Sequence, residues 1–223
     1  MQAPFHYEVV DLSEDEAARE REVFGGLAES VRRLSEASLL TTVDDDEARS
    51  VQREIDALTE RLRSSSIPGP FGVHVTTTGQ VRGHGNAVVG MRNPIAVPLE
   101  VQRDHGRAWA EFELNSLYEG PPTKVHGGVV ALLLDQIFGE TAASAGTPGM
   151  TGTLTLRYLR PTPLGKCSAE AWVDRHDGVK TFVKGVMRDA DGETTVEAEG
   201  VFILPRWARE QLARHQETPP RFE

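Results

Sequence analysis

Two glycines and one aspartate between Val125 and Asp135 have the types and spacing that could do chemistry. Gly127 and Gly128 open a long apolar run, and the first N–H groups of a helix have no partner within it. With no side chains in the way, these groups and the helix dipole could stabilise negative charge developing on a carbonyl oxygen. Asp135 interrupts the apolar run, and a lone carboxylate there is expected to be paired or functional.

The spacing limits how these groups could cooperate. Gly127 and Asp135 are eight residues apart, about 12 Å along a helix, whereas a base must lie within ~3 Å of its proton. Either they do not cooperate, and Asp135 is a satisfied structural carboxylate, or Asp135 acts opposite Gly127 of a second copy. Two antiparallel helices related by a two-fold axis would form two such sites, so the second alternative requires a homodimer.

The elements that must position these residues follow from the hydrophobic pattern. Residues 127–145 are apolar nearly all round, which predicts a buried helix. Before them, strands are predicted at 99–102 and 108–114, the apolar residues of the second not all on one face. Turn signals separate four later strands, at 150–160, 166–175, 179–188 and 193–204. Hairpins in place of crossover helices indicate an α+β fold with an antiparallel sheet around one long helix.

The N-terminal third differs from the rest in charge. Residues 1–66 hold 16 acidic side chains and 8 arginines, a net of −8 out of −10 for all 223 residues. Ser13 with Glu16 forms a capping box, and the acidic run 44–47 favours a second helix start, so residues 12–66 are predicted to be helical.

The sequence therefore divides into four predicted segments. They are an acidic helical extension at 1–66, an irregular linker at 67–92, a main domain at 93–206 and a tail at 207–223. The linker is expected to contain at most one short strand, and the tail a short helix at 207–216. The extension carries no chemical motif, so we expect it to act in packing, covering or assembly.

Composition excludes several classes of function. The net charge of −10 disfavours binding to nucleic acid or to an anionic membrane surface. The longest purely apolar run, Val129–Leu134, is far shorter than the ~20 residues of a membrane span, and the acidic first residues are not expected to form a signal peptide. Cys167 is the only cysteine, which predicts no intrachain disulfide and a cytoplasmic location. Scattered histidines predict no metal and no cofactor.

The same stretch resembles a known family. His126-Gly127-Gly128 with Asp135, preceded by Tyr118–Pro122 and followed by Arg157–Leu164, is similar to the hotdog-fold acyl-CoA thioesterases of the PaaI type, closest to thioesterase-superfamily members 4 and 5. The resemblance covers about residues 93–204. It implies a hotdog fold, homodimers often paired into homotetramers, and hydrolysis of a fatty or aryl acyl-CoA in lipid metabolism.

The resemblance also implies roles for individual residues. The Gly127 N–H would polarise the thioester carbonyl, aided by Gly128, and His126 would orient the loop or the carbonyl. Asp135 would activate water as a general base or attack directly as a nucleophile.

Two further positions follow from the family pattern. A polar residue sixteen positions after the aspartate often assists it, which is Thr151 in this chain, with Thr153, expected on the same strand face, as the fallback. The chain departs from the pattern at Gly120, where many PaaI-type enzymes carry asparagine. Asn115 lies nearby in sequence without an assigned role.

Coenzyme A would bring phosphates to an acidic protein, so local basic residues must receive them. The candidates are Arg157, Arg160, Lys166, Lys180 and Lys184, although each could equally be a solvated residue of a strand.

Two other functions stay open. One is a hotdog dehydratase acting on 3-hydroxyacyl thioesters, which would usually place a histidine in the base role near the helix. The other is a non-catalytic acyl-CoA-binding or regulatory protein. The position of Asp135 within the helix, with His126 before it, favours hydrolysis.

Overall fold

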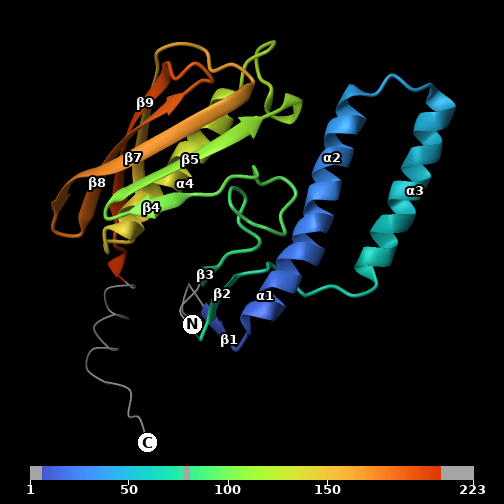
Figure 1. Cartoon of the computed structure of the whole chain (residues 1–223), viewed down its shortest axis with the longest axis horizontal. Coiled ribbons are helices and arrows are strands. Elements are labelled where there is room, and N and C mark those ends of the chain that lie inside the picture. The colour runs from blue at the N-terminus through green and yellow to red at the C-terminus, as the bar shows by residue number, and fades with distance from the viewer. Residues whose placement is uncertain (1–6, 78–80, 207–223) are drawn as a thin grey trace, which may run out of the picture. The chain divides into compact units, whose positions relative to one another are not determined.

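The computed structural model describes residues 7–77 and 81–206, and the chain forms two compact units that divide between Ala96 and Val97 (Figure 1). The helix predicted at 207–216 lies outside the described residues.

The first unit contains the predicted helices. They are α1 (Glu14–Glu20), a π-helical turn (Arg21–Gly25), α2 (Gly26–Leu40) and α3 (Asp45–Arg63). Ser13 and Glu16 form the capping box at the start of α1. The Asp44 carboxylate accepts hydrogen bonds from the first N–H groups of α3. Both helix starts predicted from acidic and capping residues are therefore confirmed.

A small sheet in this unit corrects the prediction for residues 67–92. This segment contains two strands, β2 (Val73–Thr76) and β3 (Val81–Arg82), where at most one was expected. The strand β1 (Tyr7–Val10) pairs in parallel with β2. Because this pairing joins segments more than sixty residues apart, local periodicity could not reveal it.

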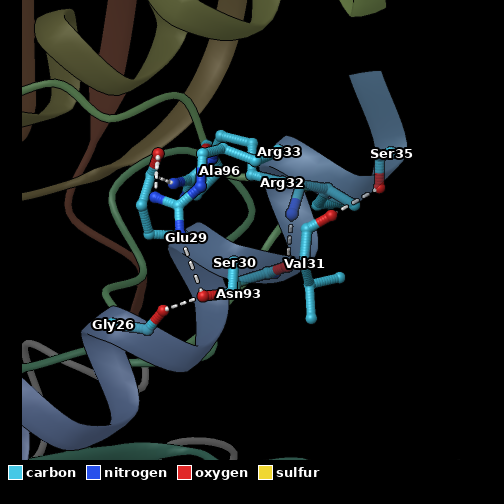
Figure 2. A network of polar contacts seen from close by, with 10 residues as sticks. Gly26, Glu29, Ser30, Val31, Arg32, Arg33, Ser35, Asn93 and Ala96 are labelled. Carbon is cyan, nitrogen blue, oxygen red and sulfur yellow. Dashed lines mark hydrogen bonds and ion pairs between the residues drawn. The ribbon is translucent and has the colours of Figure 1, made fainter. Parts of the chain in front are cut away.

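A side chain of α2 contacts the end of the first unit. The Arg32 Nε donates to the Ala96 carbonyl oxygen at 3.1 Å, and its guanidinium also pairs with Glu29 one turn earlier (Figure 2). The arginine therefore joins α2 to the segment before the second unit.

A charged cluster around Glu20 joins α1 to β3 and the following loop. The Glu20 carboxylate pairs with the buried Arg82 and with Arg92, and lies 3.2 Å from the His84 Nδ1. Burial lowers the pKa of His84 to about 4, and the positive charges of Arg82 and Arg92 contribute to the same shift. His84 is therefore neutral at neutral pH.

The second unit is a six-stranded antiparallel sheet in the order β4-β5-β7-β8-β9-β6. Its strands are β4 (Gln102–Asp104), β5 (Arg107–Leu114), β6 (Met150–Tyr158), β7 (Gly165–Asp177), β8 (Lys180–Arg188) and β9 (Thr194–Ile203). The four strands predicted after the long helix are confirmed within a few residues at their ends. A short 3₁₀ turn, Ser116–Tyr118, follows β5.

Two details before the helix differ from the prediction. The strand expected at 99–102 begins only at Gln102. In β5, burial alternates strictly, and the apolar residues at positions 108, 110, 112 and 114 all lie on the buried face. The expectation that they would not share a face was wrong, because Trp109 alone lies on the other face and is 39% exposed.

The helix α4 (Gly127–Ser144) packs against the sheet and contacts all six strands. Its inward side chains, including Leu133, Ile137 and Phe138, are fully buried. Gly185 and Gly200 make room for the Phe138 ring, since a Cβ at either would lie within 2.7 Å of it. The predicted sheet around one long helix is confirmed. The helix is not buried all round, however, because Leu132 is 44% exposed.

Candidate active site

His126 caps the N-terminus of α4 with its own side chain. Its backbone is extended, and its Nδ1 accepts a hydrogen bond from the Gly128 N–H at 3.0 Å. Because a backbone N–H can only donate, this bond requires Nδ1 to be unprotonated, which places the ring proton on Nε2. His126 therefore caps the start of α4 with its own ring.

This capping leaves one donor open at the helix start. The N–H groups of Val129 and Val130 both donate to the His126 carbonyl oxygen, and the Gly128 N–H is taken by the His126 ring. Within the part of the chain that the structure describes, only the Gly127 N–H of this turn has no acceptor. The expected aid of the Gly128 N–H to a substrate carbonyl is therefore not available in this arrangement, whereas the Gly127 N–H is free to give it.

The loop before α4 holds His126 in place through the backbone. The His126 N–H donates to the Tyr118 carbonyl oxygen, and the Val125 N–H to that of Thr162, each at 2.9 Å. Gly120 packs directly on His126, since a Cβ at position 120 would lie 2.7 Å from the His126 Cα. An asparagine at position 120 would therefore not fit this backbone without a shift.

Asn115 has a structural contact in the same loop. Its side-chain oxygen accepts a hydrogen bond from the Leu117 N–H and so caps the short 3₁₀ turn. The amide therefore has a local role that accounts for it without substrate.

Asp135 and Thr151 are brought together. The Thr151 hydroxyl donates to the Asp135 Oδ1 at 2.7 Å, and Asp135 is half-buried on α4. The hydroxyl orients the carboxylate and leaves its second oxygen available for a proton. The contact joins the two residues that the family pattern pairs at a spacing of sixteen.

Gly127 and Asp135 lie on one continuous helix, eight residues apart, which corresponds to about 12 Å along its axis. A single thioester carbonyl and its attacking water span only a few ångströms. One copy of α4 therefore presents the Gly127 N–H and the Asp135 carboxylate at two different places.

Thr153 does not share a face with Thr151, contrary to the expectation. Thr151 lies opposite Phe202 and Thr153 opposite Val201, so Gly152 is an extra residue that forms a β-bulge. Residues paired directly across strands point to the same side of the sheet, and Phe202 is buried on the side of α4. The bulge therefore turns Thr153 to the outer face, beside Lys184.

The candidate phosphate-binding residues lie apart from this site. Arg157 pairs with Glu197 across β6 and β9 at 3.7 Å, and Arg160 pairs with Glu193 at 3.1 Å. Lys184 pairs with Asp174 on the outer face, and this contact lowers the Asp174 pKa. Lys166 and Lys180 are exposed. The structure gathers none of these five residues around α4.

A tyrosine that sequence reasoning did not single out touches the site. The Tyr158 hydroxyl donates to the Gly127 carbonyl oxygen at 2.8 Å. Tyr158 lies in β6 opposite the buried Val196, on the face toward α4. The alternation of β6 after the bulge could have indicated this face, but only once the bulge was known.

Neither an activated cysteine nor a cluster of metal ligands is found among the described residues. Cys167 is buried, and burial together with the nearby Asp189 raises the pKa of its thiol to about 11, so it stays protonated at neutral pH. Over residues 7–77 and 81–206, no three His, Cys, Asp or Glu side chains are grouped so as to hold a metal ion.

Comparison with known proteins places this site in a family. The family model described as "Thioesterase superfamily" matches residues 123–196, which include Gly127, Asp135 and Thr151. A solved crystal structure described as a thioesterase superfamily protein is 31% identical in sequence and superimposes with a TM-score of 0.72. The match covers 81% of this chain and 90% of the other. The chain belongs to the thioesterase superfamily. Its sheet and central helix are the hotdog fold that the resemblance implied.

Curated relatives of this thioesterase-superfamily chain match over a shorter stretch. Acyl-coenzyme A thioesterase THEM4 of Xenopus laevis is 34% identical over 95 residues, which are 41% of this chain and 42% of the relative. Acyl-coenzyme A thioesterase THEM5 of Homo sapiens is 28% identical over 110 residues, which are 48% of this chain and 42% of the relative. The match thus spans less than half the length of these relatives.

None of the helices in the described ranges combines the length and apolar character that a bilayer crossing requires.

Proposed function

We propose that this thioesterase-superfamily chain is an acyl-CoA thioesterase whose active site forms between two copies of the chain. Two features of α4 carry this proposal. The Gly127 N–H has no hydrogen-bond acceptor in the described residues, and the Asp135 carboxylate is oriented by Thr151. The superfamily and the names of the curated relatives support thioester hydrolysis as the chemistry.

The Gly127 N–H would bind the thioester carbonyl oxygen. As water adds to the carbonyl carbon, negative charge develops on that oxygen, and a preorganised donor at a helix N-terminus stabilises it. The His126 cap fixes the turn that presents this donor.

Asp135 would take the proton from the attacking water. The water oxygen bonds to the carbonyl carbon, the C–S bond breaks, and the proton ends on the thiolate, so acyl-CoA and water give the free acid and coenzyme A. Thr151 occupies Oδ1, which leaves Oδ2 for the proton. In the alternative, the Asp135 carboxylate attacks the carbonyl itself and water hydrolyses the resulting anhydride.

The distance between the two groups supports a shared site. Because Gly127 and Asp135 are about 12 Å apart on one helix, they can act on one thioester only if they come from different copies. In an antiparallel pair of α4 helices, Gly127 of one copy lies opposite Asp135 of the other, and the two-fold axis makes two equivalent sites. Leu132 lies between Gly127 and Asp135 in sequence and is exposed. It offers apolar surface for the contact between the two α4 helices.

A thiol-release assay on a panel of acyl-CoAs tests the proposal. Wild type should release coenzyme A, and Asp135→Asn should keep the fold but lose most of the rate. The buried thiol of Cys167 keeps the reagent background low. Acyl-CoA binding without release would instead indicate a binding protein, and loss of water from a 3-hydroxyacyl-CoA would indicate a dehydratase. Near-normal kcat in Asp135→Asn would contradict the mechanism.

A single turnover in ¹⁸O-labelled water separates the two roles of Asp135. A general base puts the label only in the acid product. A nucleophile gives an acid product with two unlabelled oxygens and leaves the label in the Asp135 side chain, when water attacks the aspartyl carbonyl of the anhydride.

A further inference from the structure

We propose that Tyr158 is a positioning residue for the thioesterase reaction, because its hydroxyl holds the Gly127 carbonyl oxygen and so restrains the backbone of Gly127, whose own N–H is the proposed donor to the thioester carbonyl. This inference rests on the proposed function. It adds a residue that acts through Gly127, because the Tyr158 hydroxyl bonds the Gly127 carbonyl oxygen and not the substrate carbonyl.

The start of α4 needs such a restraint. Two successive glycines have more backbone freedom than any other pair of residues, so ordering them costs more conformational entropy. The first turn of a helix also lacks half of its internal hydrogen bonds and tends to fray. A donor at this position polarises a carbonyl efficiently only if its direction is set before the substrate arrives.

The peptide between Gly127 and Gly128 is held at both of its polar ends. Its N–H donates to the His126 Nδ1 at 3.0 Å, and its carbonyl oxygen accepts from the Tyr158 hydroxyl at 2.8 Å. A carbonyl oxygen has two lone pairs, so the tyrosine bond adds to the helical one. The two contacts come from different elements, one from the loop before α4 and the other from β6.

The tyrosine ring also restricts the Gly127 backbone directly. A Cβ at Gly127 would lie 3.3 Å from the Tyr158 Oη and 3.5 Å from its Cζ. The ring therefore lies against the backbone of Gly127.

The strand β6 carries one supporting residue for each of the two groups on α4. Thr151, which orients Asp135, and Tyr158, which holds Gly127, lie on the α4 side of the same strand. The Tyr158 side chain is half-exposed, at 51%, so burial of the ring alone does not account for it. The hydroxyl bond is its most specific contact.

Tyr158→Phe in the full chain tests this role, because it removes the hydroxyl and keeps the ring. A hydrogen bond to a neutral carbonyl contributes modestly, so we expect kcat to fall about 5- to 10-fold with KM changed less than about 2-fold. Thr155→Val is the matched control: it also removes one hydroxyl from β6, but on the outer face away from α4. Its kcat and KM should equal those of wild type.

A second readout does not depend on activity. In ¹⁵N-glycine-labelled protein, the Gly128 amide should exchange with solvent several times faster in Tyr158→Phe than in wild type, because the peptide is then held at one end only. Thr155→Val should leave this exchange rate unchanged.

The outcomes separate this proposal from the proposed function. Wild-type kcat in Tyr158→Phe, an unchanged Gly128 exchange rate, or an equal loss in Thr155→Val would each overturn the role of Tyr158. Wild type that releases no coenzyme A would overturn the proposed function and the catalytic part of this inference together, while faster Gly128 exchange would still support the positional part. A lower kcat in Tyr158→Phe with faster exchange supports both.

Discussion

Replacing Gly127 by proline removes the proposed carbonyl-polarising donor with little other change. Gly127 is the first residue of α4, a position that proline favours because its missing N–H has no helical partner there. His126 before it has φ −62° and ψ 130°, the extended conformation that a residue before proline adopts. The substitution therefore suits the backbone that the chain already has.

The structure sets the size of the expected loss. In the described first turn, the N–H groups of Gly128, Val129 and Val130 all donate hydrogen bonds to His126. None of them can therefore replace the Gly127 donor. Removing one donor of this kind costs about 10²- to 10³-fold in kcat, or about 2.7–4 kcal/mol. We expect a loss in this range for Gly127→Pro.

Thiol release under saturating acyl-CoA measures this loss. Gly127→Ala is the matched control, because it adds the same Cβ, 3.3 Å from the Tyr158 Oη, but keeps the N–H. We expect Gly127→Ala to retain kcat within a few-fold, and circular dichroism should show both variants folded. A folded Gly127→Pro with a kcat near that of Gly127→Ala would refute the role of this N–H.

Three further outcomes follow from the contacts. Thr151→Val should lower kcat about 10-fold in the thiol-release assay by freeing the Asp135 carboxylate, whereas Thr151→Ser should retain it; equal rates in the two variants would contradict this. Gly120→Asn should destabilise the second unit by about 1–3 kcal/mol, seen as a lower Tm by tryptophan fluorescence, because its Cβ would lie 2.7 Å from the His126 Cα; an unchanged Tm would contradict the close packing. The pKa of His84 in the folded protein, about 4, lies below the ordinary histidine value of 6.5. As pH falls, His84 is therefore protonated in the unfolded chain before it is protonated in the folded chain. The first unit should therefore lose about 1–2 kcal/mol, allowing for screening, as pH falls from 6.5 to about 4. Urea unfolding followed by far-UV circular dichroism measures this loss, and His84→Gln should flatten it; the same pH slope in both would rule His84 out.

Local patterns were sufficient for the elements of the second unit. The apolar run from Gly127, the turn signals and the strand alternation predicted α4 and the four strands after it, because each depends on neighbours close in sequence. The contact between Asp135 and Thr151 was expected from the family pattern and not from periodicity, since a helix and a strand meet there only in the folded chain.

What could not be predicted depends on long-range contacts. The bulge at Gly152 reverses the face of Thr153, and it shows only in the register of β6 against β9. A Cβ at Gly152 would lie 2.7 Å from the Ile203 Cδ1, so glycine is needed there, but the sequence alone shows no such neighbour. The contact of Tyr158 with Gly127 has the same origin, because it depends on where β6 lies beside α4.

The central claim is that Gly127 and Asp135 act on one thioester from different copies of the chain, and a mixing experiment tests it most directly. Asp135→Asn and Gly127→Pro should each be almost inactive alone. When the two variants are unfolded together and refolded at equal amounts, about half of the dimers carry one of each, and each such dimer has one site with both residues intact. We expect thiol release to recover to about a quarter of the wild-type rate. If both residues served a site within one copy, no intact site could form, so a mixture as inactive as the separate variants would rule out the shared site.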